Sequence, residues 1–310
     1  MTNSSQLPIL VSGASGQLGR LVLSELLDAR RIPPDQIIAT TRTPELLSDF
    51  ARRGVIVRKA DFDQPDSLPK AFAGAKRMLI ISTTPEHDGT SRAQKQIAAI
   101  KAGVDAGVEH IIYTSVANAE ANEPCFWHRE HYETELALID SGVNWTILRN
   151  WDYPNWHLEQ DWSQALKTGE YWTARGAGRA NHITREDCAR AAAGALLSDI
   201  SANRRFDVTG PESLTAEEIM SLLTEFTGKK IKIVHCTREE LETRYLSLGI
   251  DAHFIPFLVG YTLGTRHGHY DGITNAFEQL CGKQPTTLRE WLMANAEGVM
   301  NVQETKVHTS

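Results

Sequence analysis

The first half of the chain alternates short apolar runs with longer segments in which apolar residues recur every three or four positions. Short β-branched runs predict strands, and longer periodic segments predict amphipathic helices. Strands are expected at residues 9–12, 37–41, 55–60, 77–82, 110–114 and 144–148. Helices are expected at residues 18–29, 44–53, 67–72, 92–106 and 130–141. Because the two kinds alternate, the pattern predicts an α/β fold with a doubly wound parallel sheet.

The pattern changes after residue 149. The following segment is irregular and rich in Trp, Gly and charged residues, until 185–198 predicts a helix and 205–209 a strand. We therefore expect two lobes, a sheet domain at 1–150 and a smaller C-terminal lobe at 151–310. The strand at 205–209 could return to the main sheet.

Composition excludes several classes of partner. The 310 residues carry a formal net charge of −7, with Lys and Arg scattered rather than gathered in a stripe. We expect neither nucleic acid nor a membrane as a direct partner. The polar N-terminus and the absence of a long apolar run favour a cytoplasmic protein. Four widely separated cysteines are expected to be free thiols.

A glycine-rich loop follows the first predicted strand and leads directly into a predicted helix. Gly13 permits a tight turn, Gly16 lets the backbone approach a pyrophosphate, and Gly19 lets the helix lie close to the strand. Backbone N–H groups at the helix N-terminus would bind the phosphates. The loop predicts a dinucleotide-binding domain of Rossmann type at 1–150. Its candidate contacts are Gly13, Ala14, Ser15, Gly16, Gln17 and Leu18.

The residues that follow the next strands favour one dinucleotide. At the end of the second strand, where NAD-specific folds place an acidic residue, this chain has Arg42. A guanidinium matches phosphate geometry, so we expect NADP(H) in preference to NAD(H), although Arg42 could also be a solvated surface charge. Further candidates for the adenine and the middle of the cofactor are Asp61, Phe62, Ser82, Thr83 and Thr84.

Several runs together resemble a known family. They are 13–19, 41–44, 60–62, 102–108, 113–115, 133–135, 141–143, 146–150, 184–187 and 282–288. The chain resembles the NmrA-like atypical short-chain dehydrogenases, and within them the bacterial NADPH:quinone oxidoreductase and triphenylmethane reductase branch. The resemblance implies that Arg42 holds the 2′-phosphate and that 150–155 closes over the nicotinamide. Its other implied cofactor contacts are Thr114, Asn150, Trp151, Asp152, Tyr153 and Arg185.

One departure bears on mechanism. Most short-chain dehydrogenases carry a Tyr-x-x-x-Lys pair, and the matching positions here are Trp127 and His131. An indole N–H cannot act as a general acid near neutral pH. A conjugated acceptor that takes hydride at an electron-poor position depends on such an acid less, and the quinone and triphenylmethane reductase branch also lacks the pair.

The sequence therefore leaves open which residue donates a proton to the substrate. Asn150, Tyr153 and His131 are the catalytic candidates, with Asp152 and His157 as further members of a proton relay. His131 could protonate a quinone oxygen, or it could bond only a backbone carbonyl or the cofactor ribose.

Aromatic residues gather in the C-terminal lobe. Trp151, Trp156, Trp162 and Trp172 lie within 22 residues of sequence, and they predict either a flat slot for a ring-shaped substrate or the core of the lobe. Trp151, Tyr153 and Trp156 are the substrate-pocket candidates. We expect no metal site, because His267, His269 and Asp271 show none of the usual ligand spacings.

Together these features predict an NADPH-dependent oxidoreductase that transfers hydride to a quinone or other conjugated aromatic acceptor. Two alternatives stay open: a non-catalytic NADP(H)-binding redox sensor, and a specialised aromatic ketone or alcohol dehydrogenase. The expected partner is a small aromatic molecule, and a homodimer is left open.

Overall fold

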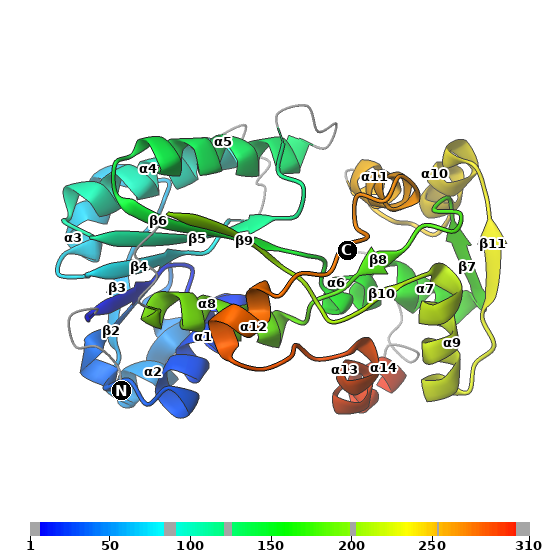
Figure 1. Ribbon diagram of the computed structural model, residues 1–310, viewed down its shortest axis with the longest axis horizontal. Coiled ribbons are helices and arrows are strands. Elements are labelled where there is room, and N and C mark those ends of the chain that lie inside the picture. The colour runs from blue at the N-terminus through cyan, green and yellow to red at the C-terminus, as the bar shows by residue number, and fades with distance from the viewer. Residues whose placement is uncertain (1–6, 84–90, 121–125, 199–202, 253, 302–310) are drawn as a thin grey trace. The chain divides into compact units, whose positions relative to one another are not determined.

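The computed structural model describes residues 7–83, 91–120, 126–198, 203–252 and 254–301. The chain divides into two compact units (Figure 1). Unit 1 comprises Met1–Asn150, Arg185–Val208 and Ala276–Lys283, and unit 2 comprises Trp151–Thr184, Thr209–Asn275 and Gln284–Ser310. Residues 185–208 and 276–283 therefore pack with the sheet domain and not with the predicted C-terminal lobe, and the strand predicted at 205–209 does return to the main sheet.

Unit 1 is built on a seven-stranded sheet in the order β3-β2-β1-β4-β5-β6-β9. All six neighbouring pairs are parallel. The strands are β1 (Ile9–Val11), β2 (Ile37–Thr41), β3 (Ile56–Lys59), β4 (Arg77–Ile80), β5 (His110–Val116), β6 (Asn144–Asn150) and β9 (Arg204–Val208). The predicted doubly wound parallel sheet of Rossmann type is confirmed, with its first six strands near their predicted positions.

Helices cover both faces of this sheet. One face carries α3 (Leu68–Phe72), α4 (Arg92–Asp105) and α5 (Phe126–Asp140), as Figure 1 shows. The other carries α1 (Gln17–Ser24), α2 (Ser48–Arg52), α8 (Arg185–Leu197) and α12 (Ala276–Cys281). Short turns of other helix types are η2 (Glu25–Ala29), η3 (Pro34–Gln36), η4 (Pro44–Leu47) and η5 (Pro65–Ser67).

The core of unit 1 follows from the apolar faces of these elements. Phe72 of α3 and Leu138 of α5 are fully buried with Met78 and Ile111 of the sheet. Burial of such side chains stabilises the layers by roughly 1.5–3 kcal/mol each. The layered packing therefore explains why the periodic segments become helices over this sheet.

The strand order places a ligand crevice. β1 pairs with β2 on one side and with β4 on the other, so the chain winds in opposite directions from β1. In open parallel sheets, ligands bind outside the carboxyl ends of the strands at such a reversal. The crevice is therefore expected beyond Val11 and Ile80.

The last strand of the sheet comes from a distant part of the chain. β9 pairs with β6, in the register Leu148↔Phe206. The preceding helix α8 packs against α1. Gly194 of α8 lets α12 approach closely, because a Cβ there would lie 2.3 Å from the carbonyl oxygen of Leu280.

Unit 2 consists of helices around two small sheets. β7 (Glu170–Thr173) pairs with β11 (Lys232–His235) in parallel, and β8 (Ala180–Asn181) pairs with β10 (Ser213–Leu214) in antiparallel. Its helices are α6 (Pro154–Glu159), α7 (Asp161–Thr168), α9 (Ala216–Thr227), α10 (Arg238–Ser247), α11 (Ile255–Arg266), α13 (Leu288–Ala294) and α14 (Ala296–Asn301). Trp162, Leu223 and Trp291 share one core cluster, and Leu241 and Leu258 share another.

In the part of the chain that the structure describes, none of the helices is long and apolar enough to cross a bilayer.

Candidate cofactor site and active-site residues

The glycine-rich loop leaves β1 and turns into α1. Gly13 adopts φ +64°, a left-handed conformation that favours glycine, and its carbonyl oxygen accepts a bond of 3.0 Å from the Gly16 N–H. Gly16 caps α1 at its N-terminal end. A Cβ on Gly19 would lie only 2.4 Å from the Gly13 carbonyl oxygen. The three glycines therefore let the loop fold tightly against the first turn of α1, whose N–H groups favour anions.

A cavity of about 260 Å³ lies at the carboxyl ends of the strands in unit 1. Its lining residues come from the glycine-rich loop and from the ends of β2, β3 and β4, with one residue from α4. They are Gly13, Ser15, Gly16, Thr40, Thr41, Arg42, Ala60, Asp61, Phe62, Asp63, Ile81, Ser82, Thr83 and Lys95. This is the position that the strand reversal indicates for a dinucleotide.

Most of the cofactor residues expected from the sequence meet at this cavity. Arg42, Asp61 and Phe62 line it beside the loop, together with Ser82 and Thr83. Other predicted cofactor residues do not line the cavity but are buried next to it or lie in the first turn of α1. Thr114 is buried and accepts a bond of 2.9 Å from the Ser82 N–H, Ala14 is buried, and Gln17 and Leu18 begin α1. Thr84 lies outside the described residues.

Sequence reasoning missed six lining residues of the cavity, among them the charged pair of Asp63 and Lys95. The Lys95 Nζ lies 2.7 Å from Asp63 Oδ1, and the Lys95 side chain is only 7% exposed. A signal was present, because the inward face of α4 carries Arg92, Lys95 and Gln96 before it becomes apolar. Polar residues on the buried face of a helix indicate a site or a polar network.

His131 lies buried on α5. Its Nδ1 is 2.7 Å from the hydroxyl of Tyr113 on β5. Burial lowers the pKa of His131 well below its usual value, and the positive charge of Arg92 adds to this. A neutral, hydrogen-bonded imidazole favours the structural alternative for His131, and its role as proton donor stays a prediction. The side chain of Trp127 is not among those that the structure describes.

Asn150 ends β6 beside a buried ionic network. Its carbonyl oxygen accepts a bond of 3.2 Å from the Ala117 N–H, and the residue is 4% exposed. The preceding Arg149 donates from Nε and a terminal nitrogen to Glu135, at 2.9 and 2.8 Å. Glu135 also accepts from Ser115 Oγ at 2.6 Å. This network fixes the end of β6, from which the chain leaves for residues 151–156.

In unit 2, Asp152 and Tyr153 lead into α6. The Tyr153 N–H donates to Asp152 Oδ1 at 3.1 Å. His157, fully buried on α6, is hydrogen-bonded to Asp152 through Nε2 and to Asp161 through Nδ1, the latter at 2.9 Å. Burial opposes a charge on His157, but the two carboxylates outweigh it and raise its pKa to about 9. His157 is therefore a cation at neutral pH in this arrangement.

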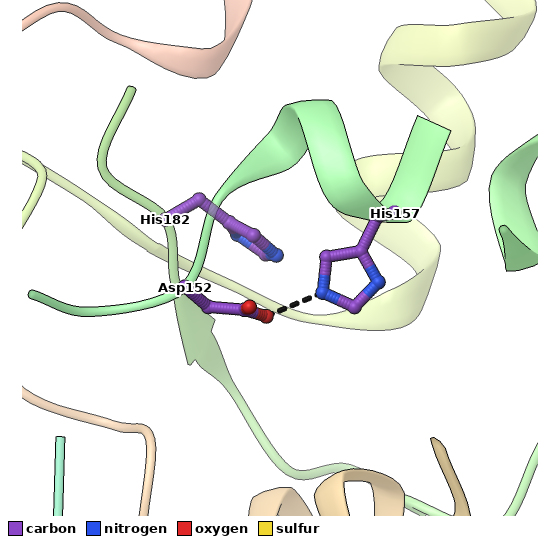
Figure 2. Close-up of side chains that lie close together, drawn as sticks. All are labelled: Asp152, His157 and His182. Carbon is purple, nitrogen blue, oxygen red and sulfur yellow. Dashed lines mark hydrogen bonds and ion pairs between the residues drawn. The ribbon is translucent and has the colours of Figure 1, made fainter. Parts of the chain in front are cut away.

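His182 completes this cluster, which Figure 2 shows in close-up. Its backbone forms a parallel β-bridge with Asp152, and its ring lies 5.3 Å from that of His157, centroid to centroid. Burial, followed by the charge on His157, lowers the pKa of His182 to about 3. No motif or spacing in the sequence indicated that His182 would lie beside Asp152 and His157.

The tryptophans of unit 2 divide between core and partly buried positions. Trp162 is fully buried and stacks on His157 at 5.2 Å. Trp156 meets Phe257 edge to face at 4.9 Å, and Trp172 lies over the guanidinium of Arg244. Trp151 packs on Gly272, where a Cβ would lie 2.6 Å from the indole. Core packing therefore accounts for Trp162, whereas the substrate contacts of Trp151 and Trp156 stay predictions.

Two further expectations can be placed. Arg185 begins α8, and its contact with a cofactor stays a prediction. His267 and His269 have ring centroids 6.2 Å apart, while Asp271 accepts from Ser213 Oγ at 2.7 Å.

Comparison with known proteins agrees with the site geometry. A family described as NAD(P)H-binding matches residues 13–199. Quinone oxidoreductase 2 of Escherichia coli is 30% identical over 282 residues, which are 91% of this chain and 96% of that protein. NAD(P)H azoreductase of Xenophilus azovorans is 24% identical over 292 residues, or 93% of this chain and 98% of that protein.

Solved structures show the same likeness. Triphenylmethane reductase of Citrobacter sp., complexed with NADP(H), superimposes with a TM-score of 0.83 at 32% identity, covering 92% of this chain and 99% of that one. The NADPH complex of the E. coli quinone oxidoreductase gives 0.82 at 30% identity, with coverage of 92% and 99%. The family match covers more than half of the chain, and the likeness to these two reductases covers more than nine-tenths of it, so the chain belongs to the NmrA-like NAD(P)H-binding family, in the branch of these two reductases.

Proposed function

We propose that this protein is an NADPH-dependent oxidoreductase that transfers hydride to a quinone or another conjugated aromatic acceptor. The observation that carries the proposal is the cavity of unit 1, where the glycine-rich loop, Arg42 and the ends of β3 and β4 meet. The names of the quinone oxidoreductase and the triphenylmethane reductase support the same class of acceptor.

The residues of the cavity fit a dinucleotide. Close packing of Gly19 on Gly13 leaves the N–H groups at the start of α1 to bind a pyrophosphate. Arg42 supplies a planar fork of donors for a 2′-phosphate, and Phe62 offers an apolar face for an adenine. When bound, NADPH supplies the hydride, and the protein supplies position and electrostatics.

The chemistry of the acceptor decides how much acid catalysis is required. A quinone takes up one hydride and one proton to become a hydroquinone, whereas a cationic triarylmethane dye takes up hydride alone. Because His131 is buried and neutral, we propose Tyr153 as the first candidate for a proton donor. Asn150 stays a candidate active-site residue, and Trp151 a candidate for contact with the cofactor and the substrate. Trp156 is the further candidate for contact with the substrate ring.

The proposal is tested by NADPH oxidation at 340 nm with a panel of quinones, cationic triarylmethane dyes and aromatic ketones. We expect turnover of quinones or dyes with NADPH, faster than with NADH. Turnover of ketones alone would instead indicate a ketone reductase. Tight NADPH binding without turnover of any acceptor would contradict the proposal and support a redox sensor.

Preference for NADP(H) is tested separately at Arg42. Charge-assisted hydrogen bonds contribute roughly 1.5–3 kcal/mol, so Arg42→Ala should weaken NADPH binding about 10- to 150-fold while leaving NADH binding nearly unchanged. The matched control is Arg52→Ala, because Arg52 is exposed on α2 and does not line the cavity. Both dissociation constants are measured by nicotinamide fluorescence. Equal losses for NADPH and NADH in Arg42→Ala would refute recognition of the 2′-phosphate.

We also propose that unit 2 supplies the substrate-binding part of the chain, consistent with the aromatic residues that follow Asn150. A cytoplasmic location fits the free thiols of Cys188, Cys236 and Cys281. The homodimer stays a prediction, which light scattering would test.

A further inference from the structure

His182 presents an unusual buried imidazole. It is 6% exposed, and in the described part of the chain neither ring nitrogen has a hydrogen-bond partner. A neutral imidazole carries one donor and one acceptor, and leaving such groups unsatisfied in a protein interior is unfavourable. Buried polar groups of this kind require an explanation, such as a bound ion.

The side chains around His182 form a set of metal-ligating atoms. One ligand atom each from Asp152, His157 and His182 lies within 4.8 Å of the other two. Figure 2 shows the three side chains pointing toward one another from different segments of unit 2. The backbone fixes two of them, because Asp152 and His182 share a β-bridge, and the Ile183 N–H donates to the Asp152 carbonyl oxygen at 2.9 Å.

The surroundings match those of a metal-bound histidine. His157 directs Nδ1 to Asp161 Oδ1 at 2.9 Å, which leaves Nε2 to face Asp152. Asp161 in turn accepts from the Tyr171 hydroxyl at 3.2 Å, and Arg175 donates to that hydroxyl at 2.6 Å. Histidines that ligate metals commonly donate their other N–H to a carboxylate in this way.

The net charge of the side chains around His182 also favours a bound cation. With neutral histidines, Asp152 and Asp161 carry two negative charges against the single positive charge of Arg175, and all three residues are largely buried. A proton on His157 is one way to balance this charge. A divalent ion with a bound hydroxide is another, and it also provides a partner for His182.

We propose that Asp152, His157 and His182 bind a divalent transition-metal ion of the zinc class. Two imidazoles and one carboxylate suit zinc, nickel, cobalt or iron rather than magnesium or calcium, which prefer oxygen ligands. Bonds of about 2.0–2.1 Å place neighbouring ligand atoms roughly 3.4 Å apart around a tetrahedral ion. Side-chain movements of about 1 Å therefore close the observed cluster on an ion, which takes the place of the hydrogen between Asp152 and His157.

The ion would join three segments of unit 2 beside the substrate candidates. Asp152 immediately precedes Tyr153, and His157 lies in the helix that Tyr153 caps. A metal bond would thus fix the backbone around Tyr153. The expectation of no metal site rested on the spacing of His267, His269 and Asp271, and it did not consider His182, which lies far along the chain from Asp152 and His157. This inference does not depend on the proposed reductase activity.

The experiment uses the full chain without a histidine tag, stripped of metal by a chelator. Co²⁺ is titrated while the visible d–d absorption is recorded, and Zn²⁺ is then added to displace it. We expect one Co²⁺ per chain with bands typical of tetrahedral coordination, and a higher thermal unfolding temperature with Zn²⁺. No bands and no thermal shift in the wild-type protein would overturn the proposal.

Variants locate the ion. His182→Gln should abolish the bands and the thermal shift, and Asp161→Asn should weaken binding roughly 10- to 100-fold, as for other residues that orient a metal ligand. The matched control is His267→Gln, from the exposed histidine pair with His269, which should bind as the wild type does. Binding that survives in His182→Gln, or is lost in His267→Gln, would refute the site.

A measurement on the wild-type protein covers the case in which His182→Gln does not fold. X-ray absorption of the Zn²⁺-loaded chain should show two imidazoles in a shell of nitrogen and oxygen. A shell with sulfur, or without imidazole, would contradict the proposal.

Discussion

Replacement of Gly19 by alanine tests whether the phosphate loop depends on close packing. The new Cβ would lie 2.4 Å from the Gly13 carbonyl oxygen and 2.7 Å from the Ala14 Cα. Carbon atoms in good contact lie about 3.5–4.0 Å apart, so the loop and the helix must separate by roughly 1 Å. Because the obstructing atoms are backbone, no side-chain rotation relieves the clash.

The magnitude follows from two opposing effects. Overpacking typically costs about 1–3 kcal/mol, while replacing a helical glycine by alanine gains up to about 1 kcal/mol. We expect Gly19→Ala to lower the free energy of unfolding by up to about 2 kcal/mol. Displacement of two phosphate-binding N–H groups, at roughly 0.5–1.5 kcal/mol each, should weaken NADPH binding about 5- to 150-fold.

The matched control is Gly260→Ala in α11, where a Cβ meets no atom within 4 Å. This variant should gain up to about 1 kcal/mol of stability and bind NADPH normally. Urea unfolding followed by circular dichroism gives the stabilities, and nicotinamide fluorescence gives the affinities. If Gly19→Ala had the same stability and the same NADPH affinity as Gly260→Ala, the loop would not depend on the close contact of Gly19 with Gly13. Our account of the phosphate site would then be wrong.

Two further predictions concern buried charge in unit 1. Glu135→Gln should lower the free energy of unfolding by about 3–5 kcal/mol, because it removes the buried counter-ion of Arg149 and leaves only the longer pair, at 3.7 Å, with the exposed Glu120. Glu225→Gln at the exposed pair with Arg289 should change urea unfolding little. Burial, with the charge of Arg77, lowers the pKa of His110 from 6.5 to about 4. The unfolded chain therefore takes up this proton first as the pH falls, and stability is lost from pH 6.5 downward, by about 2 kcal/mol at pH 5. Between pH 6.5 and pH 5, His110→Asn should therefore lose less unfolding free energy than the wild-type protein, as measured by urea titration at each pH. The same pH dependence in both proteins would contradict the assignment of this loss to His110.

Local sequence determined the framework of unit 1. Alternating strand and helix periods predicted β1 to β6 and the helices between them, because burial on a sheet or on one helix face imposes a repeat that can be read along the chain. Positive φ at Gly54, Gly107 and Gly142 agrees with the helix ends expected there. The glycine-rich loop likewise indicated the cofactor site, because its backbone requirements are local.

Only the tertiary structure decided which distant residues meet. β9 pairs with β6 although 53 residues separate Asn150 from Arg204, and Lys95 of α4 reaches Asp63 in the turn that follows β3. Tyr113 is hydrogen-bonded to His131, and His182 lies in a cluster with Asp152 and His157. The spacing of these residues along the sequence predicted neither contact. The physical reason is that periodicity records which face of an element is buried, whereas the partner on that face depends on how all elements pack. The residues of the cofactor loop could therefore be predicted, but the buried polar clusters that surround the catalytic candidates could not.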